Sequence, residues 1–332
     1  MEISKKKNLR CLLLNKKASL LPHFSVQKTT ARYNNIPWGA LLSIMKKINL
    51  IAFALVALLA GCQGETENVE RPLYPTEGAI NARYSIADGV TVVFAKGNLQ
   101  YQASSHSWRF ANRQYDVIGY DNELVDTTYA GWIDLFGWGT SGEGDLMPYT
   151  VSDTSDRYAY GMFDIGGTQY DWGLHNSISN GGNRVGEWRT MTLKEWTYLM
   201  KYRTSAQLKK AFATIENVGL DGADMHGMMF LPDKWELPEG CTFQYGVKEG
   251  FSTNVYSADQ WNKMEGAGAI FLPAAGERDG VTVSLVGDYG CYWTTSGYTL
   301  ESAYELYFLS SGYDFYPTNR ATGHSIRLVM EK

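Results

Sequence analysis

The stretch TLKEWTYLMKYR, residues 192–203, carries the clearest helix signal in the sequence. Thr192 is followed three residues later by Glu195, the capping box that opens many helices. The apolar residues of this stretch recur at helical spacing on one face: Leu193, Trp196, Leu199 and Met200. The sequence therefore predicts an amphipathic helix in a chain whose remaining segments mostly favour strands and turns.

A second helix is predicted where SADQWNKMEGAG repeats the capping box with Ser257 and Gln260 and ends at Gly266. Elsewhere, short apolar runs alternate with Gly, Asn, Asp and Ser, which favour turns. Strands are predicted at 90–95, 227–232, 268–273, 281–286, 303–308 and 325–329. The runs GMMFLP and GAIFLP indicate two strands with similar endings, not duplicated domains. The predicted fold class is α+β, with two helices, small and mainly antiparallel sheets, and long structured loops.

Charge is distributed unevenly along the 332 residues. Residues 1–62 contain ten of the 30 Lys and Arg residues but only one, Glu2, of the 35 acidic residues. The rest of the chain therefore has 20 basic and 34 acidic residues, a net charge of −14. Such an acidic surface repels phosphate backbones, so nucleic acid is not expected as a partner.

Residues 45–62 have the pattern of a bacterial lipoprotein signal. Met45 is followed by two lysines, an uncharged apolar run and the sequence LAGC, which ends at Cys62. The apolar run is shorter than the ~20 residues of a membrane-spanning helix, which makes a transmembrane anchor the weaker alternative. We predict residues 45–62 as a lipoprotein signal peptide and Cys62 as the lipidated residue. Residues 1–44 precede a complete signal, so we interpret them as an upstream extension from a start site assigned too early.

The segment after Cys62 is polar and acidic, and residues 63–80 are predicted to be a flexible tether. Residues 81–330 contain no second linker and are predicted to form one domain. The acidic residues directly after Cys62, namely Glu65, Glu67 and Glu70, resemble export signals of surface lipoproteins. We therefore expect an outer membrane lipoprotein exposed at the cell surface, which contacts the membrane through its lipid anchor.

Cys241 and Cys291 are the cysteines that remain in the expected mature domain. An exported protein meets conditions that permit disulfides, so the two could form one bond. Two free, partly buried thiols are an equally good interpretation. Sequence spacing does not decide between these alternatives.

Several stretches, in their order along the chain, resemble a known family. They are FAKGNLQY, SWRFANRQYDVIG, GWIDLFGWGTSG, DWGLHNSISNGGN, WRTMTLKEWTYLM, FLPAAGERDG and YWTTS with the AYELYF, NR and GHSIRLV that follow. Together they are similar to Gram-negative surface lipoproteins with a Fibrobacter major paralogous-type domain, in the formylglycine-generating-enzyme-like branch of the C-type lectin fold. The resemblance implies a C-type-lectin-like fold whose final strands and loops expose a variable surface. Where the family usually has an aromatic residue, this chain has His324, which we interpret as a half-buried structural histidine.

No enzymatic activity is expected. The formylglycine-generating relatives use a copper ion held by two cysteines close together in the final stretch, where this chain has Cys291 alone. The Glu-Pro-Asn, Gln-Pro-Asp and Trp-Asn-Asp motifs of calcium-dependent lectins do not occur in the sequence. The histidines are scattered without the paired spacing of a zinc site. We therefore predict no catalytic residue, no metal and no cofactor.

The C-terminal region is rich in Tyr, Ser, Thr, Asn and Gly, a composition typical of antibody-like binding surfaces. In AYELYF, alternation predicts Tyr304, Leu306 and Phe308 on the core side and Glu305 and Tyr307 on the outer side. The predicted ligand-binding residues are Tyr298, Glu301, Glu305, Tyr307, Tyr313, Tyr316, Asn319 and Arg320. We expect these residues to bind a protein or glycan, in an adhesin or in a retroelement-diversified binding protein. The alternatives are a structural or accessory subunit of a fimbrial or envelope assembly and, less favoured, a copper oxidase.

Overall fold

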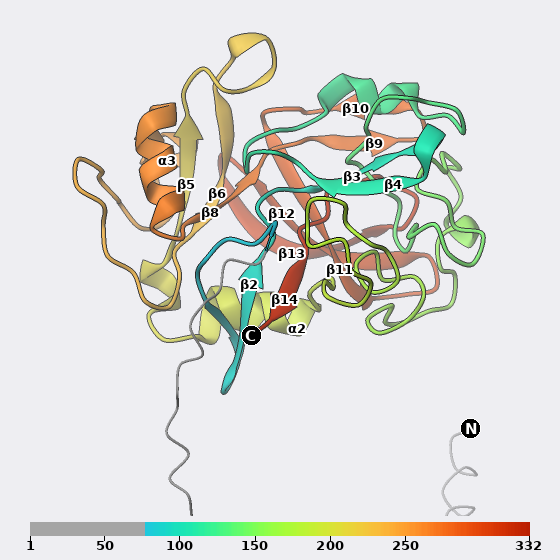
Figure 1. Cartoon of the computed structure of the whole chain (residues 1–332), viewed down its shortest axis with the longest axis horizontal. Helices are drawn as coiled ribbons and strands as arrows, with labels where there is room; N and C mark the ends of the chain where they lie inside the picture. Colours follow the sequence, from blue (N-terminus) through green and yellow to red (C-terminus); the bar gives the residue numbers. More distant parts are fainter. Residues whose placement is uncertain (1–76) are drawn as a thin grey trace, which may run out of the picture. The chain divides into compact units, whose positions relative to one another are not determined.

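The computed structural model describes residues 77–332 (Figure 1). The predicted extension, the signal peptide with Cys62 and most of the tether lie outside this range. Ala79 forms a β-bridge with Ala95, and the amide of Ile80 donates to the carbonyl of Phe94 at 2.8 Å. The domain therefore begins slightly before the predicted boundary at residue 81. Within the described range, no helix has the length and apolar character needed to cross a membrane.

Short strands make up most of the regular structure. They are β1 (Tyr84–Ala87), β2 (Val90–Phe94), β3 (Leu99–Gln102), β4 (Ser107–Phe110), β5 (Lys210–Ile215), β6 (Met225–Phe230), β7 (Val255–Tyr256), β8 (Ile270–Pro273), β9 (Glu277–Asp279), β10 (Thr282–Ser284), β11 (Tyr289–Gly297), β12 (Ser302–Leu309), β13 (Gly312–Asn319) and β14 (Val329–Glu331). The sheets have the strand orders β1-β2-β14, β3-β4, β7-β5-β6-β8, β9-β10 and β11-β12-β13. Within them, β5 and β7 pair in parallel and the other pairs are antiparallel. This architecture confirms the predicted α+β class and its small, mainly antiparallel sheets.

Both predicted helices form where their capping boxes start. In α2 (Leu193–Thr197), the Thr192 hydroxyl accepts from the amide of Glu195, whose side chain accepts from the amide of Thr192, and a π-helical turn, η4 (Tyr198–Tyr202), continues the helix. Ser257 and Gln260 cap α3 (Ala258–Gly266) in the same way. The short 3-10 helices are η1 (Ala103–Ser105), η2 (Gly119–Leu124), η3 (Ser155–Arg157), η5 (Ala206–Leu208), η6 (Leu220–Gly222) and η7 (Gly250–Thr253). The remaining chain consists of turns and loops, as the glycine content predicts.

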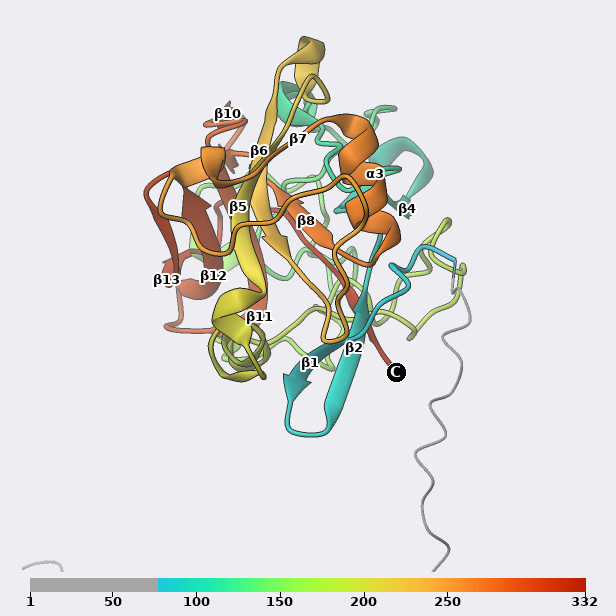
Figure 2. The same cartoon turned by 90° about the vertical axis from the view of Figure 1, so that its left-hand side faces the viewer.

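The two FLP-ended runs are neighbours in one sheet. Strands β6 and β8 pair antiparallel, with Gly227 opposite Pro273 and Phe230 opposite Ile270. Gly227 has no room for a side chain, because a Cβ there would lie 2.4 Å from the carbonyl oxygen of Leu272. Figures 1 and 2 show α3 beside this sheet, where it buries Trp261 and Met264 in the core. The similar endings therefore belong to paired strands of a single sheet.

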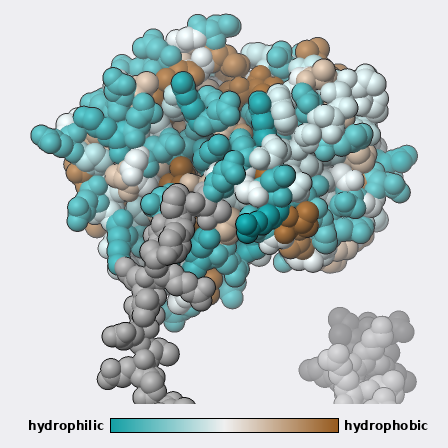
Figure 3. All heavy atoms as spheres, viewed as in Figure 1, coloured by the Kyte–Doolittle hydropathy of each residue, from teal (hydrophilic) through white to brown (hydrophobic). Residues whose placement is uncertain are grey.

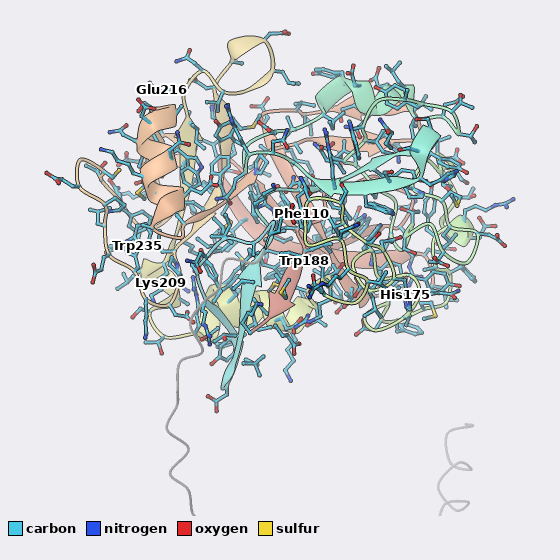
Figure 4. All side chains as sticks on the ribbon, viewed as in Figure 1. Phe110, His175, Trp188, Lys209, Glu216 and Trp235 are labelled. Carbon is cyan, nitrogen blue, oxygen red and sulfur yellow. The ribbon has the colours of Figure 1, made fainter. Side chains whose placement is uncertain are left out.

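Aromatic side chains dominate the core. Six tryptophans are fully buried: Trp138, Trp172, Trp188, Trp196, Trp261 and Trp293. Trp188 meets Phe110 edge-on, with ring centroids 4.8 Å apart (Figure 4). In contrast to this interior, the face drawn in Figure 3 is mostly hydrophilic, with apolar side chains in small separate groups. Burial of these large rings supplies much of the hydrophobic stabilisation available to so loop-rich a chain.

Three buried arginines hold irregular segments through backbone carbonyls. Arg278, Arg320 and Arg327 are each at most 1% exposed. The Arg327 guanidinium donates to the carbonyls of Ala95 and Phe271 at 3.1 and 2.9 Å. Because a guanidinium carries five donors in a fixed plane, one side chain can fix several loop carbonyls at once.

The strand predicted at 325–329 is only partly formed. Val329 starts β14, but Ser325 makes an isolated bridge to Tyr292. The side chains of Ile326, Arg327 and Leu328 are all buried. This segment is covered on both sides, so alternation of apolar residues does not mark an exposed face here.

Candidate functional site

The stretch YGCYWTTSG forms β11, and it lies beside β12 and β13 in one antiparallel sheet. Figure 2 shows β13 at the outer side of this sheet. Tyr292, Leu306 and Phe308 point to one side and pack in the core, as the alternation in AYELYF predicts. We call this side the core face. The opposite side, the outer face, carries Tyr289, Cys291, Trp293, Glu305, Tyr307, Asp314 and Tyr316 by register.

Three tyrosines form a row across the strands on the outer face. The rings of Tyr289 and Tyr307 have centroids 6.1 Å apart, and those of Tyr307 and Tyr316 are 6.5 Å apart. Tyr316 is 61% exposed, and the exposed Asp314 lies opposite Tyr307. The row, Tyr289, Tyr307 and Tyr316, presents aromatic side chains from three adjacent strands of one sheet, and Tyr316 is its most exposed member.

Three other predicted ligand-binding residues are exposed at the end of the sheet where β11 turns into β12. Tyr298 is 53% exposed and contacts Tyr304 edge-on, with ring centroids 5.3 Å apart. Glu301 is exposed in the same loop, and Asn319 is exposed at the end of β13. Five of the eight predicted binding residues therefore lie at this loop end or in the tyrosine row.

The other three predicted contacts lie away from the open part of the outer face: Glu305 and Arg320 are buried, and the half-buried Tyr313 points to the core face. Glu305 lies on the outer face as predicted but is only 3% exposed, because other segments cover that part of the face. Tyr313 points to the core face, where its ring meets Phe212 at 6.4 Å and the ammonium of Lys210 at 5.7 Å.

Arg320 is fully buried and has a structural role. Its guanidinium donates to the carbonyls of Ala159, Met162 and Thr299 and lies 4.3 Å from the ring of Trp138. Burial lowers the pKa of Arg320 to about 10, which still leaves it charged at neutral pH. The prediction that Arg320 points outward is therefore wrong.

A polar cluster, buried except for Glu277, lies under the covered part of the outer face. We define it as Glu277, Cys291, Glu305 and His324. The Nδ1 atom of His324 lies 3.0 Å from Oε2 of Glu305, and its Nε2 atom lies 3.8 Å from Oε2 of Glu277. The imidazole also packs on Trp293, with ring centroids 4.4 Å apart. The predicted half-buried histidine is in fact fully buried, with a carboxylate on each side.

Two segments bring the cluster together along the edge of β11 that does not pair with β12. The Ser325 amide donates to the Cys291 carbonyl at 3.0 Å, which holds the adjacent His324 against the strand. The amide of Gly276 donates to the carbonyl of Tyr289 at 2.8 Å, and Glu277 follows directly. Glu277 starts β9, so its position is fixed by a short hairpin with β10. Backbone pairing therefore brings together four side chains that are far apart in the sequence.

Charges in the cluster set the protonation states of its members. Burial by itself would lower the pKa of His324, but Glu305 and Glu277 outweigh it and raise this pKa to about 9. The pKa of Glu277 is lowered, mainly by its interaction with His324. Burial, and then the charges of Glu305 and Glu277, raise the pKa of the Cys291 thiol well above its usual value. Cys291 is therefore a neutral thiol at neutral pH and not an activated nucleophile.

Sequence reasoning missed this cluster. Glu277 lies in GERDG and His324 in GHSIRLV, and neither string has metal-ligand or catalytic spacing. The sequence shows Cys291 as the one cysteine of the final stretch, and alternation predicts that Glu305 points outward. The available signal was His324, at a position where the family that the sequence resembles has an aromatic residue.

Cys241 and Cys291 are both free, buried thiols. The Cys241 sulfur contacts the carbonyl of Gln260 at 3.6 Å, and its neighbours in the core include Tyr256 and Trp261. Cys291 instead lies among the charged groups of the polar cluster. Of the two alternatives left open by the sequence, the structure has the pair of free thiols.

An open pocket of about 360 Å³ lies at η6, lined in part by Tyr120, Asp224, His226 and Asp288. The Nδ1 atom of His226 lies 2.9 Å from the carbonyl oxygen of Gly287. Its ring stacks on Phe251 with centroids 4.8 Å apart. His226 is therefore held by structural contacts, and the methionines around it are buried in β6, where such residues fill the core.

The described residues have an α+β fold, which confirms the predicted class. The C-type-lectin-like arrangement and the lipoprotein family remain predictions from the sequence stretches quoted above. Comparison with family models, with curated proteins and with solved structures finds no match to this chain.

Proposed function

We propose that the protein is a surface-exposed outer membrane lipoprotein that binds a protein or glycan ligand through the outer face of β11–β12–β13. The observation that carries this proposal is the tyrosine row, whose rings lie on three adjacent, hydrogen-bonded strands. Tyrosine offers a large contact area with few torsions to immobilise, so it is enriched where proteins recognise other molecules. A sheet also holds the rings in place before binding, which reduces the entropic cost.

The proposed contact residues are revised from the sequence prediction. Tyr307, Asp314 and Tyr316 form the centre, and Tyr298 with Glu301 contributes from the adjoining loop. Asp314 and Glu301 are acidic and exposed, so a ligand with hydroxyl or basic groups suits this surface. Both a polyhydroxylated glycan and a basic protein surface have this chemistry.

A binding array tests the proposed surface. Full-length protein purified in detergent is applied to immobilised glycans and host proteins, as wild type and as Tyr307→Ala/Tyr316→Ala. Hot-spot tyrosines typically contribute about 2 kcal/mol or more, so the double variant should bind at least about tenfold more weakly. Tyr245→Ala is the matched control, because Tyr245 is 60% exposed in a loop outside this sheet. Equal binding by wild type and double variant would exclude this surface.

Lipid attachment has its own experiment. Cells that express the full chain are labelled with a radioactive fatty acid, and the protein is isolated. We expect label in the wild type and in Cys11→Ser, but not in Cys62→Ser. Label that persists in Cys62→Ser would contradict the lipoprotein assignment without affecting the binding surface.

A further inference from the structure

The polar cluster contains three side chains of the kinds that bind metal ions. Within residues 77–332, Glu277, Cys291 and His324 each direct a ligand atom to one place, and these atoms lie within 4.8 Å of one another. We propose that these three residues bind a divalent transition-metal ion of the zinc class, with Glu305 as a positioning residue. The proposal is independent of the proposed binding function.

The ligand types select the class of metal. Thiolate, imidazole and carboxylate are the three side-chain ligands that zinc takes in proteins. Calcium and magnesium prefer oxygen ligands alone, so a site with one sulfur and one nitrogen disfavours both.

The spacing is close to that of a tetrahedral zinc site. Zinc bonds of about 2.0–2.3 Å separate neighbouring ligand atoms by about 3.3–3.8 Å. The Glu277 and His324 atoms are already 3.8 Å apart, and the widest separation in the group is at most 4.8 Å. The Glu277 side chain is 32% exposed, so it has space to rotate. A contraction of about 1 Å at most completes the geometry.

Unsatisfied polar atoms are a second, independent observation. Both ring nitrogens of His324 and Oε2 of Glu305 are buried without a hydrogen-bond partner. The short Nδ1–Glu305 distance of 3.0 Å is thus an ion-pair contact that lacks hydrogen-bond alignment. Native structures rarely leave buried polar atoms without a partner. The His324 ring is fully buried, so a bound metal ion can satisfy a nitrogen that has no solvent contact.

Glu305 completes the arrangement from the other side of the imidazole. A small ring rotation lets Nδ1–H donate to Glu305 while Nε2 binds the metal beside Glu277. Metal-bound histidines commonly donate their second ring nitrogen to a carboxylate, which fixes the tautomer and orients the ring. Three protein ligands also leave a fourth coordination position for water or for a donor atom of another molecule.

A dication also offsets the negative charge that its ligands carry once it is bound. A Cys291 thiol that binds the metal loses its proton, so its thiolate adds to the negative charges of Glu277 and Glu305. A metal ion offsets the charges of its own ligands and keeps a coordinating thiol deprotonated. Cys291 is paired directly with Tyr307, so the metal site adjoins the tyrosine row.

Metal titration of the full-length protein tests the proposal. Untagged protein is stripped with a chelator and titrated with zinc by calorimetry, and with cobalt(II) by absorption spectroscopy. We expect one ion per chain and a thiolate-to-cobalt charge-transfer band. Cys291→Ser should abolish this band and weaken zinc binding at least tenfold. Cys241→Ser is the matched control, because Cys241 is the other free, buried thiol, and it should leave both signals unchanged.

Two further variants separate metal binding from folding. Glu277→Gln alters the most exposed ligand and should weaken zinc binding while circular dichroism shows a folded protein. Glu305→Gln should weaken it about 10–100-fold, as loss of an outer carboxylate commonly does. His175→Ala is a control for adventitious binding at an exposed histidine (Figure 4). The proposal is overturned if the wild type binds no stoichiometric zinc, or if Cys291→Ser and Glu277→Gln retain wild-type affinity.

Discussion

The two faces of the β11–β12–β13 sheet are built from alternate residues of the same strands, yet their surroundings differ. Leu306 and Phe308 enter an apolar core. Glu305 and Tyr307 are only two residues apart on the outer face, but Glu305 is buried beside His324 and Tyr307 remains partly exposed. The comparison shows that alternation decides which side chains share a face. Whether that face meets solvent depends on which other segments cover it.

The core face should contribute most to stability. Phe308 is fully buried and stacks on Tyr292 with centroids 6.2 Å apart. Phe308→Ala should lower the free energy of unfolding by about 3–5 kcal/mol through lost burial and a residual cavity. Urea unfolding of wild type and variant measures the difference. A loss below about 1 kcal/mol would mean that this face is not tightly packed.

Substitution of Glu305, in the covered part of the outer face, should lower the free energy of unfolding by less than substitution of Phe308. Glu305→Gln removes a carboxylate 3.0 Å from a buried imidazole. The expected cost is about 1–3 kcal/mol, because the partner loses a charged contact without gaining access to water. Urea unfolding of metal-stripped protein at pH 7 measures it, with the exposed Glu301→Gln as control. Identical stability of the two variants would indicate that the buried carboxylate is energetically neutral.

Lys210 lies beside Tyr313 at the edge of the core face, and it should make the free energy of unfolding depend on pH. Burial, and then the charges of Arg203 and Lys201, lower the pKa of Lys210 to about 8. Between pH 8 and about 10.4 the unfolded chain keeps the proton that the folded protein has lost, so stability rises with pH. At about 1.4 kcal/mol for each pH unit, this rise should be between about 1 and 3 kcal/mol. Lys210→Met should flatten the difference when unfolding is measured across this range, and an unchanged slope contradicts the assignment.

The open part of the outer face should contribute least to stability. Tyr316 is 61% exposed on an edge strand. Tyr316→Ala should change the free energy of unfolding by no more than about 0.5 kcal/mol. Thermal unfolding monitored by circular dichroism measures this value. A loss above about 2 kcal/mol would show that Tyr316 supports the sheet, and weaker ligand binding by its variants could then not be assigned to lost contacts.

Local signals in the sequence predicted local structure well. The capping boxes at Thr192 and Ser257 place both helix starts, because a cap depends on residues three positions apart. Alternation in AYELYF also placed Leu306 and Phe308 correctly. Tyr313 was misplaced because its face depends on its register with β12, where it lies opposite Phe308.

The polar cluster could not be predicted, because long-range backbone pairing assembles it. Glu277 and His324 are 47 residues apart in the sequence, and the edge of β11 brings them together. The same limit applies to Arg320, whose burial follows from carbonyls of residues 159 and 162. Such contacts join residues that are far apart in the chain, so no short sequence motif predicts them.

The contacts of Arg320 have a consequence for sequence variation. Its guanidinium holds the loops near Ala159, Met162 and Thr299 by main-chain carbonyls alone. Every residue type provides a main-chain carbonyl, so the contact of Arg320 with residue 299 does not depend on the side chain at that position. The loop that presents Tyr298 and Glu301 can therefore acquire new chemistry at its tip with its base held in place. In this loop, the contact that fixes the backbone is separate from the exposed side chains of Tyr298 and Glu301.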